Sequence, residues 1–231
     1  MKVCIDAGHN HSGYDTGAQG NGLKEQDVTF FIADKLKSLL EGENITVVMT
    51  RPALSSNTDN SSINASLTKR SQFSNSNNCD LFVSIHCNAG GGTGTECYAY
   101  SEKSAGYALA GDILKNLTEK LPLRNRGVKT ADFAVLRLTN CPAVLLETAF
   151  IDNYNDSIML KNNQNDFAGG IASGIFKYLG IQPKSEITIA EMKACIASIC
   201  GFSSPDGVFG LLDTHMYASD LYKKWYESYK K

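Results

Sequence analysis

The sequence predicts an α/β fold: a three-layer sandwich in which helices flank a mostly parallel, twisted sheet, with a small helical segment at the C-terminal end. Short apolar, β-branched runs alternate along the chain with longer segments whose apolar residues recur at helical spacing. The run Leu81–Ile85 is continuously apolar, which is typical of a strand buried on both faces. Strands that alternate with helices of this length favour a layered sandwich around a parallel sheet.

The expected elements follow in chain order. In the first half they are a strand at Lys2–Asp6, a Gly-rich loop at Ala7–Gly22, a helix at Gln26–Leu40, a strand at Ile45–Thr50, a Ser/Asn-rich loop at Ser55–Ala65 and a short helix at Thr68–Ser76. In the second half they are strands at Leu81–Ile85 and Thr95–Tyr100, a helix at Ser104–Leu121, a strand at Ala143–Leu146 and a helix at Asp166–Leu179. The turn-rich stretch Ile181–Ser185 is interpreted as a linker, so we expect a main domain at 1–181 and a small helical segment at 182–231.

Composition limits the possible functions. The 231 residues are 42% hydrophobic and 20% charged, an ordinary globular composition that excludes disorder and collagen-like repeats. With 22 basic and 24 acidic residues, no electrostatic signature for nucleic acid or an anionic membrane is present, and we expect neither partner. The seven cysteines are scattered without a CxxC pair, which favours reduced, mostly buried thiols.

Polar side chains follow three of the predicted strands. His9 follows the first strand, His86 follows Leu81–Ile85, and Glu147 follows Val144–Leu146. Because ligand crevices of open α/β sheets form beyond the carboxyl ends of strands, we expect these side chains to meet there. Glu25, where the Gly-rich loop meets the first long helix, is a fourth candidate.

Two imidazoles and a carboxylate form a catalytic zinc set that leaves the fourth position to water. A second carboxylate is then needed to take a proton from that water and pass it to a leaving amine. On these grounds alone, either Glu25 or Glu147 could be the ligand and the other the base. His11 is a possible substitute for His9, although its loop neighbours favour a solvated residue. Cys87 is expected to pack, and His215 is expected to be a surface residue.

Several longer motifs resemble one enzyme family in order and without large gaps over about residues 2–180. They are Asp6-Ala7-Gly8-His9, Asp15-Thr16-Gly17-Ala18, Gly22–Asp27, Thr50-Arg51, Leu67–Arg70, Asp80–Ala89, Gly94-Thr95-Glu96, Asn125–Lys129, Phe133–Arg137 and Pro142–Glu147. Together they resemble the zinc-dependent N-acetylmuramoyl-L-alanine amidases of the amidase 3 type.

The resemblance implies a role for each candidate. His9, Glu25 and His86 would hold one Zn²⁺, and Glu147 would be the catalytic base and acid. The substrate would be peptidoglycan, cleaved at the amide between the lactyl group of N-acetylmuramic acid and L-alanine. Asn10-His11 stands where Gly-Gly is commoner, which leaves the contacts of this loop with substrate open.

One residue in a matched segment and one glycine run near His86 each allow two roles. Arg51 ends a strand, where it would either meet a stem-peptide carboxylate or pair with an internal acid. The run Gly90–Gly92 would give the loop mobility beside the site, or would be a plain connector.

Two other functions remain as alternatives. A metal-free glycosidase would use Glu25 and Glu147 as its acid/base pair, and a non-catalytic peptidoglycan-binding protein would use neither. The N-terminus lacks the apolar stretch of a secretory signal. We therefore expect synthesis in the cytoplasm and action on the bacterial wall after release, as in phage lysis or lysis of a mother cell.

The C-terminal segment holds two helical patterns, Thr188–Cys200 and Thr214–Lys230, joined by a turn sequence. Aromatic residues of the second pattern recur at helical spacing, which suits docking onto another helix or stacking on sugar rings. Pro205–Gly210 resembles the loop of small helical peptidoglycan-binding domains. A wall-binding or docking role for 182–231 is the resulting hypothesis.

Overall fold

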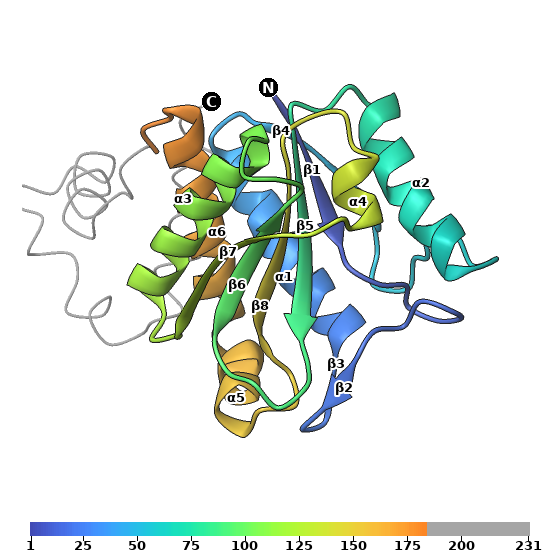
Figure 1. Cartoon of the computed structure of the whole chain (residues 1–231), viewed down its shortest axis with the longest axis vertical. Helices are drawn as coiled ribbons and strands as arrows, with labels where there is room; N and C mark the ends of the chain where they lie inside the picture. Colours follow the sequence, from blue (N-terminus) through green and yellow to red (C-terminus); the bar gives the residue numbers. More distant parts are fainter. Residues whose placement is uncertain (184–231) are drawn as a thin grey trace, which may run out of the picture. The chain divides into compact units, whose positions relative to one another are not determined.

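The computed structural model describes residues 1–183, a unit built around one large sheet (Figure 1). The predicted helices Thr188–Cys200 and Thr214–Lys230, and with them the wall-binding or docking hypothesis, lie outside the described residues. The division of the chain at residue 181 therefore stays a prediction.

A six-stranded sheet forms the centre of the unit, as the sequence predicts. Its strands lie in the order β4 (Thr46–Met49), β1 (Lys2–Ala7), β5 (Leu81–Asn88), β8 (Ala143–Phe150), β6 (Thr95–Ala99) and β7 (Asn125–Thr130). The first four strands run parallel, β6 pairs antiparallel with β8, and β7 pairs parallel with β6. The expectation of a mostly parallel sheet is confirmed.

Helices cover both faces of the sheet (Figure 1). One layer holds α1 (Glu25–Gly42), α3 (Ala105–Lys120) and α6 (Gln164–Leu179), and the other holds α2 (Ile63–Ser76) and α4 (Ala134–Arg137). Successive strand residues alternate between the two layers: Val3 and Ile5 pack with the first, whereas Cys4 packs with the second. Burial on both faces explains why the central strands are apolar throughout.

The structure corrects several of the predicted elements. Helix α2 begins at Ile63 rather than Thr68, because the Ser62 hydroxyl accepts a hydrogen bond from the Ala65 amide and caps the helix inside the expected Ser55–Ala65 loop. The expected Gly-rich loop contains a small hairpin, β2 (Gln19–Gly20) and β3 (Leu23–Lys24). Strand β7, helix α4 and helix α5 (Tyr154–Asn162) were not predicted. Strand β7 lies at the edge of the sheet, and its polar, half-buried residues carry no apolar pattern.

A buried ion pair joins the sheet to α2. The carboxylate of Asp6, at the end of β1, accepts hydrogen bonds from Arg70 Nη1 at 2.7 Å, Thr50 Oγ1 at 2.6 Å and Ser84 Oγ at 2.7 Å. Asp6 and Arg70 are both fully enclosed. Because each oxygen of Asp6 has a partner, this charge is tolerated in the core.

We predict that Asp6→Asn lowers the free energy of unfolding at pH 7 by about 3–5 kcal/mol, because it leaves the buried Arg70 charge with only its 3.4 Å ionic contact to Asp15. Burial alone would raise the pKa of Asp6, but the charge of Arg70 and the hydrogen bonds of Thr50 and Ser84 lower it below the usual 3.8. The contribution is therefore complete above about pH 4 and is lost as the pH falls through the folded-state pKa. Urea unfolding at pH 7 and at pH 3 measures both effects.

Asp132→Asn is the control, because its ion pair with Arg137 is exposed and should contribute little. Equal losses in the two variants, or an Asp6→Asn effect that does not shrink at pH 3, would contradict the prediction.

Candidate metal centre and active site

Three of the four predicted site residues come together at the carboxyl edge of the sheet. Glu25 Oε1 lies 3.0 Å from His9 Nε2 and 3.1 Å from His86 Nδ1, and the two imidazole nitrogens are 3.2 Å apart. Within residues 1–183 this is the only group of three or more His, Cys, Asp or Glu side chains close enough to hold one metal ion. The proximity follows from topology, since β1 and β5 are parallel neighbours that end at the same edge.

Glycines allow this close approach. A Cβ atom on Gly8 would lie 2.6 Å from the His86 ring. A Cβ atom on Gly17 would lie 2.7 Å from the ring of His9 and 2.9 Å from the Glu25 carboxylate, and Gly17 also has a left-handed φ of +68°. Larger residues at either position would therefore displace the three converging side chains.

The loop that carries His9 is fixed by Arg51. His9 has a left-handed φ of 66°, and the buried Arg51 guanidinium donates to the carbonyl oxygens of Gly8 at 3.2 Å, His9 at 3.2 Å and Gln26 at 3.0 Å. Both expected roles of Arg51 are wrong, because its hydrogen bonds go to backbone carbonyls rather than to an acid or towards solvent.

Asn10 also holds the His9 loop in place. It is fully buried, and its Oδ1 accepts from the Thr58 amide at 2.9 Å while its Nδ2 donates to the Asp59 carbonyl at 2.8 Å. Asn10, which stands where the family more often has glycine, therefore ties the His9 loop to the segment before α2. His11 is exposed and lies outside the group of three, and His215 lies outside the described residues.

Asp15 orients His9, a role that sequence reasoning did not assign. His9 Nδ1 donates to Asp15 Oδ1 at 2.8 Å, which directs Nε2 towards Glu25 and His86. Asp15 Oδ2 accepts from Ser66 Oγ at 2.7 Å and from Arg70 Nη2 at 3.4 Å. Burial alone would lower the pKa of His9, but hydrogen bonds to the two carboxylates outweigh it and raise the pKa to about 9.

Glu25 is held by backbone amides. Its Oε1 accepts from the Cys87 N–H at 2.9 Å, and its Oε2 accepts from the Ala18 N–H at 2.8 Å. Although burial raises the pKa of Glu25, hydrogen bonds from His86 and His9 outweigh it and hold the pKa well below its usual range. Cys87 itself packs as expected, with its buried thiol 3.5 Å from Thr148 Oγ1.

Glu147 lies beside this group without being part of it. In the parallel pairing of β5 with β8, Glu147 is the register partner of His86. Its Oε2 is buried and has no hydrogen-bond partner among the described residues. Burial raises the pKa of Glu147 to about 7, with the charge of His86 acting to lower it and that of Glu25 to raise it. Such a carboxyl group can accept and release a proton near neutral pH.

The loop that follows β5 is anchored at both ends. Asp152 accepts from the amides of Gly90 at 2.7 Å and Gly91 at 2.8 Å, while Asp156 accepts from the Gly94 amide and the Thr93 hydroxyl, each at 2.8 Å. Of the two expected roles, these contacts favour a connector over a mobile segment.

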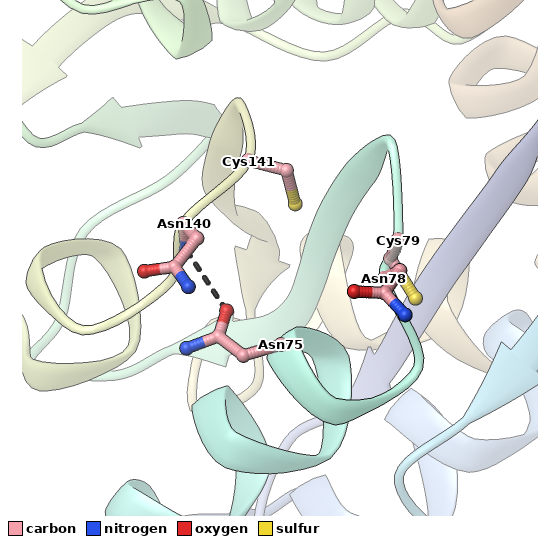
Figure 2. Close-up of a pocket in the computed structure, with 5 residues that line it drawn as sticks. All are labelled: Asn75, Asn78, Cys79, Asn140 and Cys141. Carbon is pink, nitrogen blue, oxygen red and sulfur yellow. Dashed lines mark hydrogen bonds between the residues drawn. The ribbon is translucent and has the colours of Figure 1, made fainter.

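A separate pocket lies where strands β5 and β8 begin, at the end of the sheet opposite the candidate site (Figure 2). It is lined by Asn75, Asn78, Cys79, Asn140 and Cys141. The backbone N–H of Asn140 donates to Asn75 Oδ1 at 2.9 Å, and this hydrogen bond joins the end of α2 to the loop before β8. None of the predicted site residues lines this pocket.

Two further observations concern the whole described unit. No helix within residues 1–183 is both long and apolar enough to cross a membrane. The described cysteines are all free thiols, of which Cys4, Cys87 and Cys97 are buried and Cys79 and Cys141 are partly buried.

Comparisons with known proteins agree with one another. Residues 3–177 match the family model described as N-acetylmuramoyl-L-alanine amidase. The chain is 41% identical over 180 residues to N-acetylmuramoyl-L-alanine amidase CwlM of Bacillus licheniformis, covering 76% of this chain and 67% of that protein. It is 38% identical over 193 residues to the endolysin of Bacillus phage SPP1, covering 79% and 68%. The solved catalytic domain of CwlV from Bacillus (Paenibacillus) polymyxa superposes with a TM-score of 0.68 at 33% identity, covering 79% of this chain and 99% of that one.

Proposed function

The chain belongs to the N-acetylmuramoyl-L-alanine amidase family, and on that premise we propose that it cleaves peptidoglycan at the amide between N-acetylmuramic acid and L-alanine. In this proposal, His9, Glu25 and His86 hold one Zn²⁺, and Glu147 is the catalytic base and acid. The observation that carries the proposal is the convergence of the three donors with a buried, unpartnered carboxylate oxygen on the neighbouring strand.

The donor set fits zinc. Two imidazoles and one carboxylate are the ligands of many catalytic zinc sites, and their donor atoms lie within 4.8 Å of one another. The hydrogen bond from His9 to Asp15 is the outer contact expected of a metal-ligating histidine. When bound, zinc would polarise the scissile carbonyl and stabilise the charge that develops on its oxygen.

Glu147 supplies the proton transfers. An amide has a poor leaving group, so its nitrogen must be protonated as the bond breaks. The free Oε2 of Glu147 would accept a proton from the attacking water and then deliver it to the alanine nitrogen. Without a bound ion, burial raises the pKa of Glu147 to about 7, and the charge of a bound Zn²⁺ would lower it towards the base form that takes the proton from water.

The metal-free glycosidase is the weaker alternative. It would need Glu25 to exchange protons with substrate, yet both oxygens of Glu25 are occupied by backbone amides and histidines. The family match also favours the amidase over a non-catalytic binding protein.

Relatives of this chain include an endolysin and a sporulation-specific amidase of Bacillus subtilis, which is 35% identical over 190 residues. We therefore propose action on the bacterial cell wall. Release by phage lysis or by lysis of a mother cell stays a prediction.

The decisive experiment incubates the protein with purified cell walls, with and without a chelator, and identifies the chemical groups released. An amidase frees the amino group of alanine, and the chelator should abolish that release. Release of reducing sugar ends, or of nothing, would contradict the proposal.

We predict that Glu147→Gln and His86→Ala separate chemistry from metal binding. Glu147→Gln should retain zinc but lose about 10²–10⁴ in turnover, because only the proton carrier is removed. His86→Ala should lose zinc as well as activity. Elemental analysis of dialysed protein and wall-lysis rates provide the two measurements. Normal turnover of Glu147→Gln would rule out the assigned base.

We further predict that Asp15→Asn weakens zinc binding by about 10–100-fold, because the hydrogen bond that orients His9 loses its charge. Competition with a chromophoric chelator measures this affinity. The control is Asp34→Asn, an exposed carboxylate on α1, which should leave zinc affinity unchanged. The assigned role of Asp15 fails if both variants bind zinc as the wild type does.

A further inference from the structure

Two cations gather around a buried carboxylate near the candidate site. Glu96 Oε2 accepts from Arg126 Nε and Lys129 Nζ, each at 2.5 Å, and its Oε1 accepts from Tyr98 Oη at 2.8 Å and Asn88 Nδ2 at 2.9 Å. Glu96 is almost completely enclosed. With one negative and two positive charges, this Glu96 cluster carries a net charge of +1.

The Glu96 cluster lies directly beside Glu147. Glu147 is the register partner of His86 on β5 and of Glu96 on β6, and opposed residues place their side chains on the same face of a sheet. Arg126 lies where the pairing of β6 with β7 is irregular, opposite Glu96. Arg126 on β7 lies two strands away from Glu147 on β8, on the side opposite His86. Because neighbouring strands are about 4.8 Å apart, the Cα atoms of Arg126 and Glu147 are about 10 Å apart.

Arg126 is fixed but retains free donors. Its Nε binds Glu96, and its guanidinium lies 4.9 Å from the centre of the Phe150 ring. Its Nη1 makes only a 3.4 Å contact with the Thr93 carbonyl, and its Nη2 has no partner among the described residues. Arg126 and Lys129 are 26% and 37% exposed, so their remaining donors are open to a ligand.

We propose that Arg126 and Lys129 bind a free carboxylate of the stem peptide during cleavage, an inference that rests on the proposed function. The N-acetylated sugars of peptidoglycan are uncharged, so carboxylates lie only on the peptide side of the scissile bond. The peptide amine also leaves by accepting a proton from Glu147, which borders the Glu96 cluster. In an extended chain, a carboxylate on the second residue of the stem peptide lies about 7 Å from the scissile nitrogen. With that nitrogen beside Glu147, the carboxylate comes within reach of the Arg126 side chain.

The second residue of the stem peptide occurs in two chemical forms, which allows a direct test of this inference. In peptidoglycan this residue is either D-glutamate, with a free carboxylate, or D-isoglutamine, in which that group is a neutral amide. A guanidinium binds a carboxylate through charge-assisted hydrogen bonds that an amide does not match. We expect the wild type to cleave a muropeptide with D-glutamate with a kcat/KM about tenfold above that for the otherwise identical D-isoglutamine muropeptide.

Arg126→Gln should remove this preference. It should lower kcat/KM about tenfold for the D-glutamate muropeptide and leave the value for the D-isoglutamine muropeptide within about twofold. Lys129→Gln should change the preference in the same direction. Arg137→Gln is the matched control, because Arg137 pairs with the exposed Asp132 and lies outside the Glu96 cluster, and it should keep the wild-type preference.

Zinc content and melting temperature of each variant separate folding from binding. Equal cleavage of both muropeptides by the wild type would overturn the inference. So would an equal loss on both substrates in Arg126→Gln, since the cluster would then act only by supporting the sheet. If the wild type cleaves neither muropeptide and releases no alanine amino groups from walls, the proposed function itself fails.

Discussion

The guanidinium of Arg70 links the core of the sheet to the candidate metal centre. It binds Asp6 at the end of β1 and reaches Asp15, whose other oxygen holds His9. Negative and positive charges therefore alternate from Asp6 through Arg70 to Asp15, and each is stabilised by its neighbours at buried positions. The orientation of the His9 ring thus depends, through Asp15, on the buried ion pair between Asp6 and Arg70. Loss of one member would leave the others buried without compensation.

Apolar runs predict the sheet and also three of the four candidate site residues, whereas Glu25 was chosen at the junction of a loop and a helix. Apolar runs identify central strands; His86 and Glu147 follow such runs directly, and His9 follows the first strand after Ala7 and Gly8. Parallel order then brings the ends of the strands to one edge. The resemblance, rather than the residue pattern, distinguished Glu25 from Glu147 as the expected ligand. The geometry separates them in the same way, since only Glu25 lies within the group of three.

Other features could not be predicted because their causes are not local. Asp15 contacts Ser66, which is 51 residues away along the chain, and no periodicity reports such a contact. Arg51 at a strand end was expected to meet a stem-peptide carboxylate or an internal acid, yet the fold surrounds it with backbone carbonyl oxygens. Strand β7 is polar because it is an edge strand, and its pairing with β6 is visible only once the sheet is assembled. Tertiary context decided each of these outcomes.

The left-handed backbone at His9 has a consequence for redesigning the candidate metal site. Histidine is among the few side chains other than glycine that adopt this conformation with any frequency, whereas β-branched residues rarely do. Exchanging His9 for a cysteine or a glutamate would therefore add backbone strain, whereas an aspartate or asparagine would adopt the same conformation. Glu25 opens a regular helix, where most residues fit without such strain. Engineering the candidate site for a softer, thiolate-binding ion should accordingly begin at position 25 and keep the imidazole at position 9.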